Sequence, residues 1–344
     1  MERSQGVNML QKTMKQILKK KANTWIETIT DKEVVKAIEK DLIITGGCFP
    51  SMITNETPND FDCYFRTKET VLKVAEYYAK VWNESHQAST NKIGKHCRVM
   101  VLDGANPSEE IKEYFGKDEV EEHNTRAVII DNCDKDRVKM VFPSDGVVGD
   151  PDEVRADEEL GIEDPVTVVK ELDEVAAAEI EKQEKKMFHP VFISSNAITL
   201  SGGIQIIVRF YGEPDKIHDT YDFVHTKAYW TYKDNEVVIP NDVYETVTNK
   251  TLIYTGSKYP VCSVFRMRKF IKRGWSINAG QILKICMQIS ELDLMNINVL
   301  EDQLIGVDSL YFMNLIEQFR KKEQSDSEWK LTPSYIVSII DKIF

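Results

Sequence analysis

The stretch that most constrains the fold is residues 42–66, which read LIITGGCFPSMITNETPNDFDCYFR. It predicts a strand at 42–45, a Gly-Gly turn, a short apolar segment, a polar turn and a second strand that starts at Asp60. Asp60 and Asp62 are two positions apart, and on an extended strand this spacing places both carboxylates on one face. Phe61 then points to the opposite face, into the core. We therefore expect a strand that presents two carboxylates beside a glycine turn.

The residue types in this stretch suggest phosphate and metal chemistry. Carboxylate oxygens on a rigid strand can hold Mg²⁺ or Mn²⁺, which share them with substrate phosphates. Gly46 and Gly47 have no side chains, so a triphosphate can approach their backbone N–H groups closely. The alternative interpretation is a glycine turn followed by two aspartates that face solvent.

Gly-Gly at 46–47 followed by Asp-x-Asp at 60–62 resembles the active-site signature of the DNA polymerase β-like nucleotidyltransferases. Within that superfamily, the order of motifs is nearest to the head domain of tRNA CCA-adding enzymes and poly(A) polymerases. The chain departs from the signature at Pro50 and Ser51, which stand where the family has Arg-Asp. The resemblance implies an α+β fold with a mixed sheet and flanking helices. Divergent versions of this family resemble proteins encoded by large tailed phages.

Two later segments follow in the family's order. Asp222 lies in an Asp-Phe pair that matches part of a family motif, although the arginines that precede it there are absent. The segment 263–277 resembles a basic helix of the family, with Arg266 and Lys269 at matched positions. Gln205 stands on a strand where the family carries an acidic residue, which leaves two carboxylates for metal binding.

The resemblance implies a metal-dependent nucleotidyltransferase that moves a nucleoside monophosphate from an NTP to a hydroxyl, with RNA as the expected acceptor. Asp60 and Asp62 would be the catalytic residues and the ligands of Mg²⁺ or Mn²⁺. The residues that it implies for nucleotide binding are Gly46, Gly47, Ser51, Asp222, Arg266 and Lys269. The alternative is an inactive form of the same fold that serves as a binding protein or as a structural component of a virion.

The charge distribution separates one segment from the rest. Residues 103–186 hold 26 Asp and Glu but 11 Lys and Arg, a balance of −15, whereas the whole chain carries −12. Like charges repel, so we expect this segment to lie outside a nucleotide site and to offer a surface to protein partners. The expected parts are an N-terminal helix with the first half of the core (1–103), an acidic insertion (104–188), the second half of the core (189–257) and a helical C-terminal domain (258–344).

Composition indicates the cellular location that we expect for the protein. No apolar run reaches the roughly 20 residues of a membrane span, and the N-terminus lacks the apolar core of a secretion signal. The six cysteines are scattered, which favours a reduced cytoplasmic protein and indicates neither disulfides nor a zinc site. A plain nucleic-acid-binding protein fits the net charge poorly. We expect no membrane association and a location in the cytoplasm, or in the host cytoplasm or virion if the chain is phage-encoded.

Local signals predict where several elements begin and turn. Thr30 stands three residues before Glu33, which is the spacing of a capping box for a helix that leads into the strand at 42–45. Thr67 is expected to cap the helix that follows the Asp-x-Asp strand. Ser-Gly-Gly at 201–203 lies between two apolar runs and predicts a hairpin.

Overall fold

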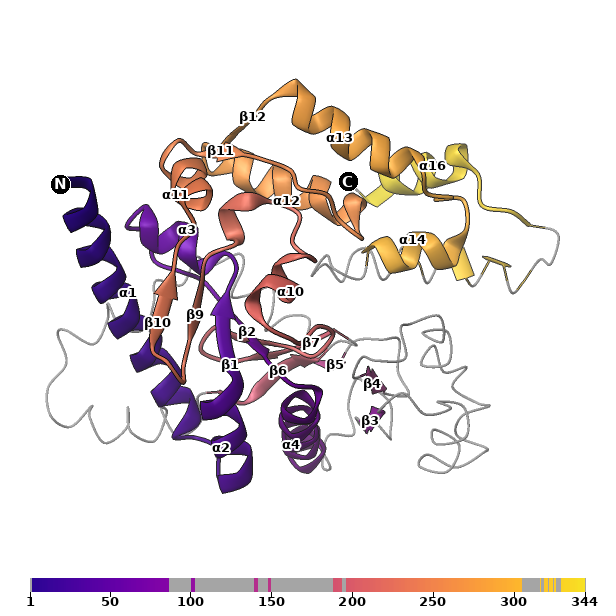
Figure 1. The fold of residues 1–344 in the computed structure, drawn as a ribbon. Helices are drawn as coiled ribbons and strands as arrows, with labels where there is room; N and C mark the ends of the chain where they lie inside the picture. The colour runs from indigo at the N-terminus through magenta and orange to yellow at the C-terminus, as the bar shows by residue number, and fades with distance from the viewer. Residues whose placement is uncertain are drawn as a thin grey trace, which may run out of the picture. The chain divides into compact units, whose positions relative to one another are not determined.

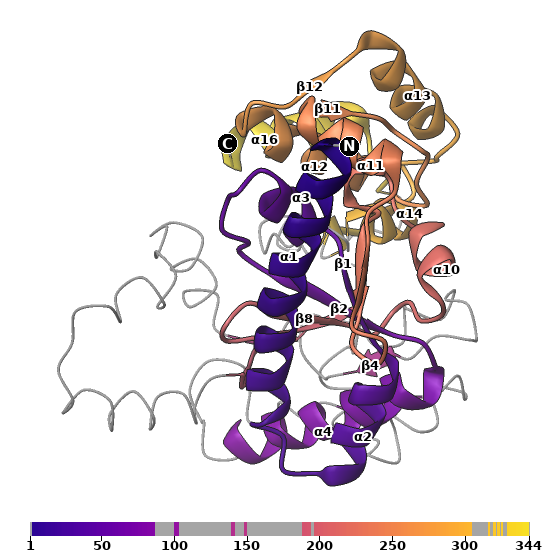
Figure 2. The same ribbon diagram turned by 60° about the vertical axis from the view of Figure 1, so that its left-hand side comes forward.

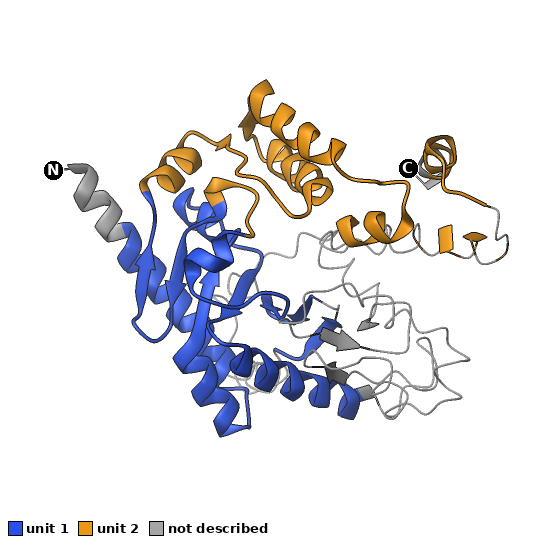
Figure 3. Ribbon diagram, turned by 45° about the vertical axis from the view of Figure 1, so that its right-hand side comes forward, with its two compact units in different colours: residues 1–219, 226–240 blue, residues 220–225, 241–344 orange. Residues whose placement is uncertain are grey.

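The computed structural model describes residues 2–86, 100–102, 139–141, 148–149, 188–193, 196–304, 316, 319–320, 322–323, 325 and 329–343. The chain divides into two compact units (Figure 3). Unit 1 comprises residues 1–219 and 226–240, and unit 2 comprises residues 220–225 and 241–344. The architecture is α+β, with a mixed sheet, flanking helices and a helical C-terminal region, which confirms the predicted fold class.

Unit 1 is built on an eight-stranded sheet in the order β10-β9-β1-β2-β8-β7-β6-β5 (Figure 1). Its strands are β1 (Leu42–Thr45), β2 (Phe61–Phe65), β5 (Val148–Gly149), β6 (Pro190–Ile193), β7 (Ala197–Leu200), β8 (Ile204–Ile207), β9 (Tyr229–Thr231) and β10 (Glu236–Val238). All neighbouring pairs are antiparallel except β2 and β8, which are parallel. A parallel pair requires a long connection, and the acidic segment lies within it.

The two central strands agree with the sequence pattern. All four residues of β1 are buried, because an apolar run at the centre of a sheet is covered on both faces. The strand bounds 42–45 are those predicted. β2 begins at Phe61, so Asp60 lies one residue before the strand and not on it. The predicted hairpin at 201–203 is confirmed, since it joins the antiparallel strands β7 and β8.

The helices of unit 1 are α1 (Glu2–Ile26), α2 (Lys32–Asp41), α3 (Cys48–Ile53), α4 (Lys68–His86) and α10 (Pro214–His218). α1 lies along the sheet (Figure 2), and the Lys21 ammonium on it is 5.2 Å from the ring centroid of Phe61. The buried indole of Trp25 on α1 donates to the Tyr78 hydroxyl on α4 over 2.6 Å. These two helices therefore share a core on the face of the sheet that carries Phe61.

The ends of the helices show which capping signals are used. Thr67 caps α4 as predicted, because its hydroxyl accepts from the N–H of Thr70 over 3.3 Å. The prediction for α2 is wrong by one residue. Asp31, and not Thr30, is the N-cap, with its carboxylate accepting from the N–H of Glu33 over 2.8 Å. An aspartate beside a threonine competes for the same N–H groups, and both are good capping residues.

Unit 2 is mainly helical. Its helices are α11 (Asn241–Thr248), α12 (Pro260–Lys272), α13 (Ala279–Ser290), α14 (Ile297–Leu304) and α16 (Pro333–Ile343). Two short strands, β11 (Thr251–Leu252) and β12 (Ser276–Ile277), pair in parallel. One apolar core of this unit is formed by Ile297, Leu300, Leu304, Ile316, Phe319, Leu331 and Ile339. None of the described helices of either unit is long and apolar enough to cross a membrane.

Most of the predicted acidic insertion lies outside the described residues. Within 104–188 the structure describes 139–141, 148–149 and 188. β4 (Lys139–Val141) pairs with β3 (Met100–Leu102), and β5 pairs with β6 at the end of the unit 1 sheet. The division of the chain into four parts stays a prediction.

Candidate functional site

A row of polar residues crosses one face of the unit 1 sheet. Asp62 on β2 lies opposite Thr45 on β1 and opposite Gln205 on β8. Thr45 in turn lies opposite Tyr229, and Gln205 lies opposite Thr199. Residues in register on neighbouring strands place their side chains on the same face. The polar row is therefore Tyr229, Thr45, Asp62, Gln205 and Thr199, on the face opposite to the one that carries Phe61.

Gly46 brings the backbone close to the centre of the polar row. It follows β1 directly and has a φ of +87°, a conformation that glycine adopts without strain. A Cβ atom at this position would overlap Oδ2 of Asp62 and lie 3.2 Å from its Cγ. The N–H of Gly46 donates to the carbonyl of Thr226 over 3.2 Å. The predicted proximity of the glycine turn and Asp62 is thus a feature of the fold.

Asp60 and Asp62 both raise the pKa of one neighbouring thiol, that of Cys48. Burial, and then the negative charges of Asp62 and Asp60, hold the pKa of the Cys48 thiol well above its usual range. Both carboxylates therefore lie near the start of α3. Asp60 is exposed and Asp62 is half-buried. The two carboxylates offer oxygen acceptors at the same end of the sheet.

The two remaining predicted residues of this stretch have different surroundings. Gly47 has a φ of −64°, and a Cβ atom there would meet nothing within 4 Å. Ser51 is buried, and its hydroxyl donates to the carbonyl of Gly47 over 3.4 Å. Gly47 is the N-cap of α3, so this hydrogen bond helps to hold the first turn of the helix. Nucleotide binding by Gly46, Gly47 and Ser51 stays a prediction.

The residues near Asp62 do not complete a carboxylate cluster. Gln205 stands at the register position where a third acidic residue would face Asp62. Among the described residues there is no group of three or more His, Cys, Asp or Glu side chains that could hold a metal ion. An amide oxygen is a weaker ligand for Mg²⁺ than a carboxylate. The metal predicted at Asp60 and Asp62, and the NTP that would accompany it, stay predictions.

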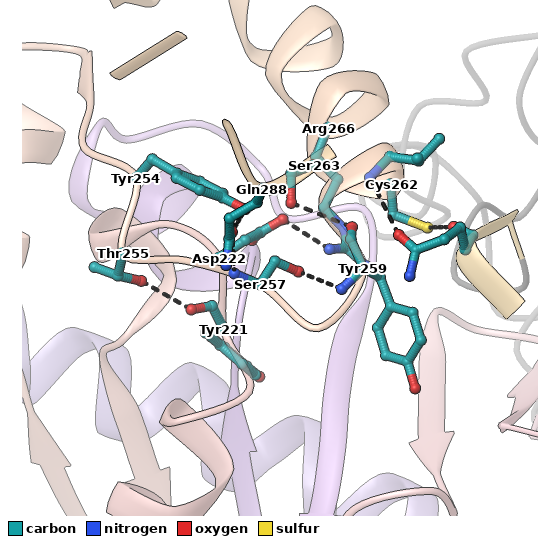
Figure 4. Close-up of polar contacts among 12 residues, drawn as sticks. Tyr221, Asp222, Tyr254, Thr255, Ser257, Tyr259, Cys262, Ser263, Arg266 and Gln288 are labelled. Atoms are coloured by element: carbon teal, nitrogen blue, oxygen red, sulfur yellow. Dashed lines mark hydrogen bonds and ion pairs between the residues drawn. The ribbon is translucent and has the colours of Figure 1, made fainter. Parts of the chain in front are cut away.

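Asp222 and Arg266 lie together in unit 2 (Figure 4). Nη1 of Arg266 on α12 is 2.8 Å from Oδ2 of Asp222, which is buried. The backbone of Asp222 is also held, because its carbonyl accepts from the N–H of Thr255 over 2.8 Å. Two residues that were predicted to bind a nucleotide therefore form an ion pair with each other. Lys269 lies on the same helix and is exposed.

Sequence reasoning missed Thr45, which belongs to the polar row, and His218, which contacts it. Oγ1 of Thr45 is 2.9 Å from Nε2 of His218, and the two residues are 173 positions apart in the chain. Neither belongs to a recognisable motif, and no local spacing connects them. A polar residue at the end of an otherwise apolar strand was the one signal that the sequence contained for Thr45.

The comparisons with known proteins identify a different family from the one that the motifs suggested. The model of the Gabija anti-defense 2 family matches residues 16–250, which is more than half of the chain. A relative described as "Gabija anti-defense 2", from Bacillus phage SPbetaL7, is 19% identical over 136 residues. That alignment covers 39% of this chain and 32% of the relative, so the chain spans about a third of the relative's length.

This match overturns the assignment to the DNA polymerase β-like nucleotidyltransferases. The descriptions of the chain as a nucleotidyltransferase, as magnesium-dependent and as RNA-binding were drawn from that assignment, and they are overturned with it. The partial motifs have structural explanations. Gly46 is required by its positive φ and by its closeness to Asp62, and Asp222 is paired with Arg266. Residues with such roles can reproduce parts of a signature. The chain belongs to the Gabija anti-defense 2 family.

Proposed function

We propose that this chain counters the Gabija defence of bacteria by binding a protein component of that system, and that it does so in the host cytoplasm during phage infection. The observation that carries the proposal is the family match over residues 16–250, which includes every strand of the unit 1 sheet and the whole polar row. The matched relative comes from a phage and is described as an anti-defence protein.

The surface proposed to contact the partner is the end of the sheet that carries Asp60 and Asp62. Asp60 is exposed, and Asp62 and Gln205 are half-buried, so their oxygens lie at or near the surface. Carboxylates form their strongest hydrogen bonds with arginine and lysine side chains or with backbone N–H groups. A basic surface on the partner would match this site, and charge complementarity would supply specificity.

Plaque counts test the proposal in cells. Bacteria that carry a Gabija system and express this chain are infected with a phage that Gabija restricts. We expect the parent chain to restore plaques, and the chain with Asp62→Asn, which removes the charge with little change in shape, to restore far fewer. Glu236→Gln is the matched control, because Glu236 is an exposed carboxylate on β10 of the same sheet. If expression of the parent chain does not restore plaques, the proposed activity is refuted.

Binding of the purified chain to the purified Gabija proteins tests the mechanism. The proposal predicts a complex with the parent chain and with Glu236→Gln, and a weaker complex with Asp62→Asn. The measurement is made with and without Mg²⁺ or Mn²⁺ and ATP. The comparison shows separately whether binding depends on these predicted cofactors. Plaque restoration by a chain that binds none of the Gabija proteins would argue against a binding mechanism.

A further inference from the structure

Three groups surround the hydroxyl of Thr45 at the end of β1. The hydroxyl oxygen is 2.7 Å from the carbonyl of Ala228, 3.4 Å from the carbonyl of Thr226 and 2.9 Å from Nε2 of His218. Thr45 is fully buried, so these distances describe its interactions within unit 1. A hydroxyl has one hydrogen to donate, and a carbonyl can only accept.

These distances determine the direction of the bond to His218. The short distance to Ala228 requires the Thr45 hydrogen to lie between the two oxygens, because two oxygens at 2.7 Å without a hydrogen repel each other. Nε2 of His218 must therefore donate to Oγ1 of Thr45. The ring then carries a proton on Nε2.

The surroundings of His218 keep its ring neutral. Burial, and then the positive charge of Lys227, lower the pKa of His218 to about 4, although Asp215 and Asp219 act in the opposite direction. The ring of Tyr229 packs against it, with the centroids 5.7 Å apart. At neutral pH the single ring proton is on Nε2, and Nδ1 is unprotonated.

Thr45 is placed to transmit this contact to Asp62. It lies directly opposite Asp62 in the β1–β2 register, and it is the residue immediately before Gly46. Thr226, whose carbonyl is 3.4 Å from the Thr45 hydroxyl, also accepts from the N–H of Gly46. One small network thus holds Thr45, which ends β1 and lies opposite Asp62, together with the glycine turn at Gly46.

We propose that His218 is a positioning residue: its Nε2–H holds Thr45, and Thr45 keeps the Gly46 turn in place against the Asp62 carboxylate. This inference rests on the proposed function, in which Asp62 contacts the Gabija partner. His218 itself does not touch that partner. Its effect is expressed through the geometry of Thr45 and Gly46.

The test compares His218→Leu with His218→Gln in the full chain. Leucine removes the donor, whereas the amide of glutamine supplies one. With the purified Gabija proteins as the probe, we expect His218→Leu to raise the dissociation constant about tenfold, the effect of losing one hydrogen bond, and His218→Gln to stay close to the parent. Thr45→Val and Thr45→Ser form a second pair that removes and keeps the hydroxyl. This pair gives the same comparison if His218→Leu fails to fold.

Nitrogen NMR of the imidazole supplies a readout that a loss of packing would not move. The parent chain should show the Nε2–H tautomer of His218 at pH 7, and the Nδ1–H tautomer would overturn the inference. Asp62→Asn separates the two proposals. If the parent chain binds none of the Gabija proteins, the proposed function fails, and if Asp62→Asn binds like the parent, the proposed contact surface at Asp62 fails. If Asp62→Asn weakens binding while His218→Leu and Thr45→Val bind like the parent, the positioning role fails and the proposed function stands.

Discussion

Gly46 lies directly against the carboxylate of Asp62, so that a side chain at this glycine would overlap Oδ2 of the aspartate. The backbone of Gly46 also has a φ of +87°, whereas that of Gly47 is −64°. A Cβ atom at Gly47 would enter open space. The two adjacent glycines therefore have different reasons to be present, and only Gly46 is required by the fold.

The first prediction is that Gly46→Ala destabilises the chain and Gly47→Ala does not. Alanine at Gly46 takes on a left-handed backbone conformation and displaces Asp62, which together should lower the free energy of unfolding by about 2 kcal/mol or more. Alanine at Gly47 should change it by less than about 0.5 kcal/mol. Urea unfolding of both variants measures the difference, and equal losses of stability would contradict this account of the turn.

The sequence was most informative where structure depends on neighbouring residues. The strand at 42–45, the cap at Thr67 and the hairpin at 201–203 follow from local patterns, and each is confirmed. The proximity of Asp62 to the glycine turn also follows from spacing, because two strands joined by a short segment pair with each other. The error at Thr30 has a local cause, since Asp31 beside it reaches the same N–H groups.

Contacts between distant residues could not be predicted in the same way. Nothing in the neighbourhood of Thr45 points to His218, because the topology of β1, β9 and α10 brings them together. The residues Asp222 and Arg266 were each predicted as nucleotide contacts, and the sequence contained no sign that they form an ion pair with each other. A motif records which residues are present and their order, but it does not record which charges are already paired within the fold.

The second prediction concerns that ion pair. Arg266→Met leaves the Asp222 carboxylate buried without this partner, and burial of an uncompensated charge is unfavourable. Because Arg266 itself is partly exposed, we expect a loss of about 1–2 kcal/mol and not the full cost of a buried pair. Lys269→Met on the same helix is the control and should change stability by less than about 0.5 kcal/mol. Thermal unfolding of the two variants distinguishes them, and equal stabilities would show that the pair does not support unit 2.

The third prediction uses two neighbouring residues of α13. Oε1 of Gln288 accepts from the Tyr254 hydroxyl and, over 3.1 Å, from the N–H of Ser257. Gln288→Met keeps the length of the side chain but removes that acceptor, which should cost about 2 kcal/mol. Met287 is 59% exposed, so Met287→Gln should be nearly neutral. The unfolding midpoints of these two variants measure how much the Oε1 acceptor of Gln288 contributes to stability. A Gln288→Met variant as stable as the parent would refute the prediction.

The last prediction concerns His225 in unit 2, which is fully buried. The rings of Phe270 and Trp275 pack against it, with centroids 4.2 and 4.6 Å from its own. Within the described part of the chain, neither of its ring nitrogens has a hydrogen-bond partner. Burial lowers the pKa of His225 from 6.5 to about 3, and the nearby charge of Arg273 adds to this, whereas Asp222 opposes it.

The consequence is a loss of stability on acidification. Between pH 6.5 and about 3 the unfolded chain binds a proton at this histidine that the folded chain does not, so the free energy of unfolding falls as the pH falls through this window. The slope approaches about 1.4 kcal/mol per pH unit for one histidine. His218, with its pKa lowered to about 4, adds a slope of the same sign.

Two variants of His225 separate titration from burial. Both His225→Gln and His225→Leu remove the titrating group, so each should reduce the dependence of stability on pH between 5 and 6.5, where most carboxylates remain charged. Only His225→Leu also removes the buried polar atoms, and it should therefore be more stable than His225→Gln at pH 7.5. Urea unfolding at several pH values measures both effects. A parent chain whose stability does not change between pH 7 and 5, or a His225→Leu variant with the parent's full pH dependence, would show that His225 does not remain neutral in the folded state.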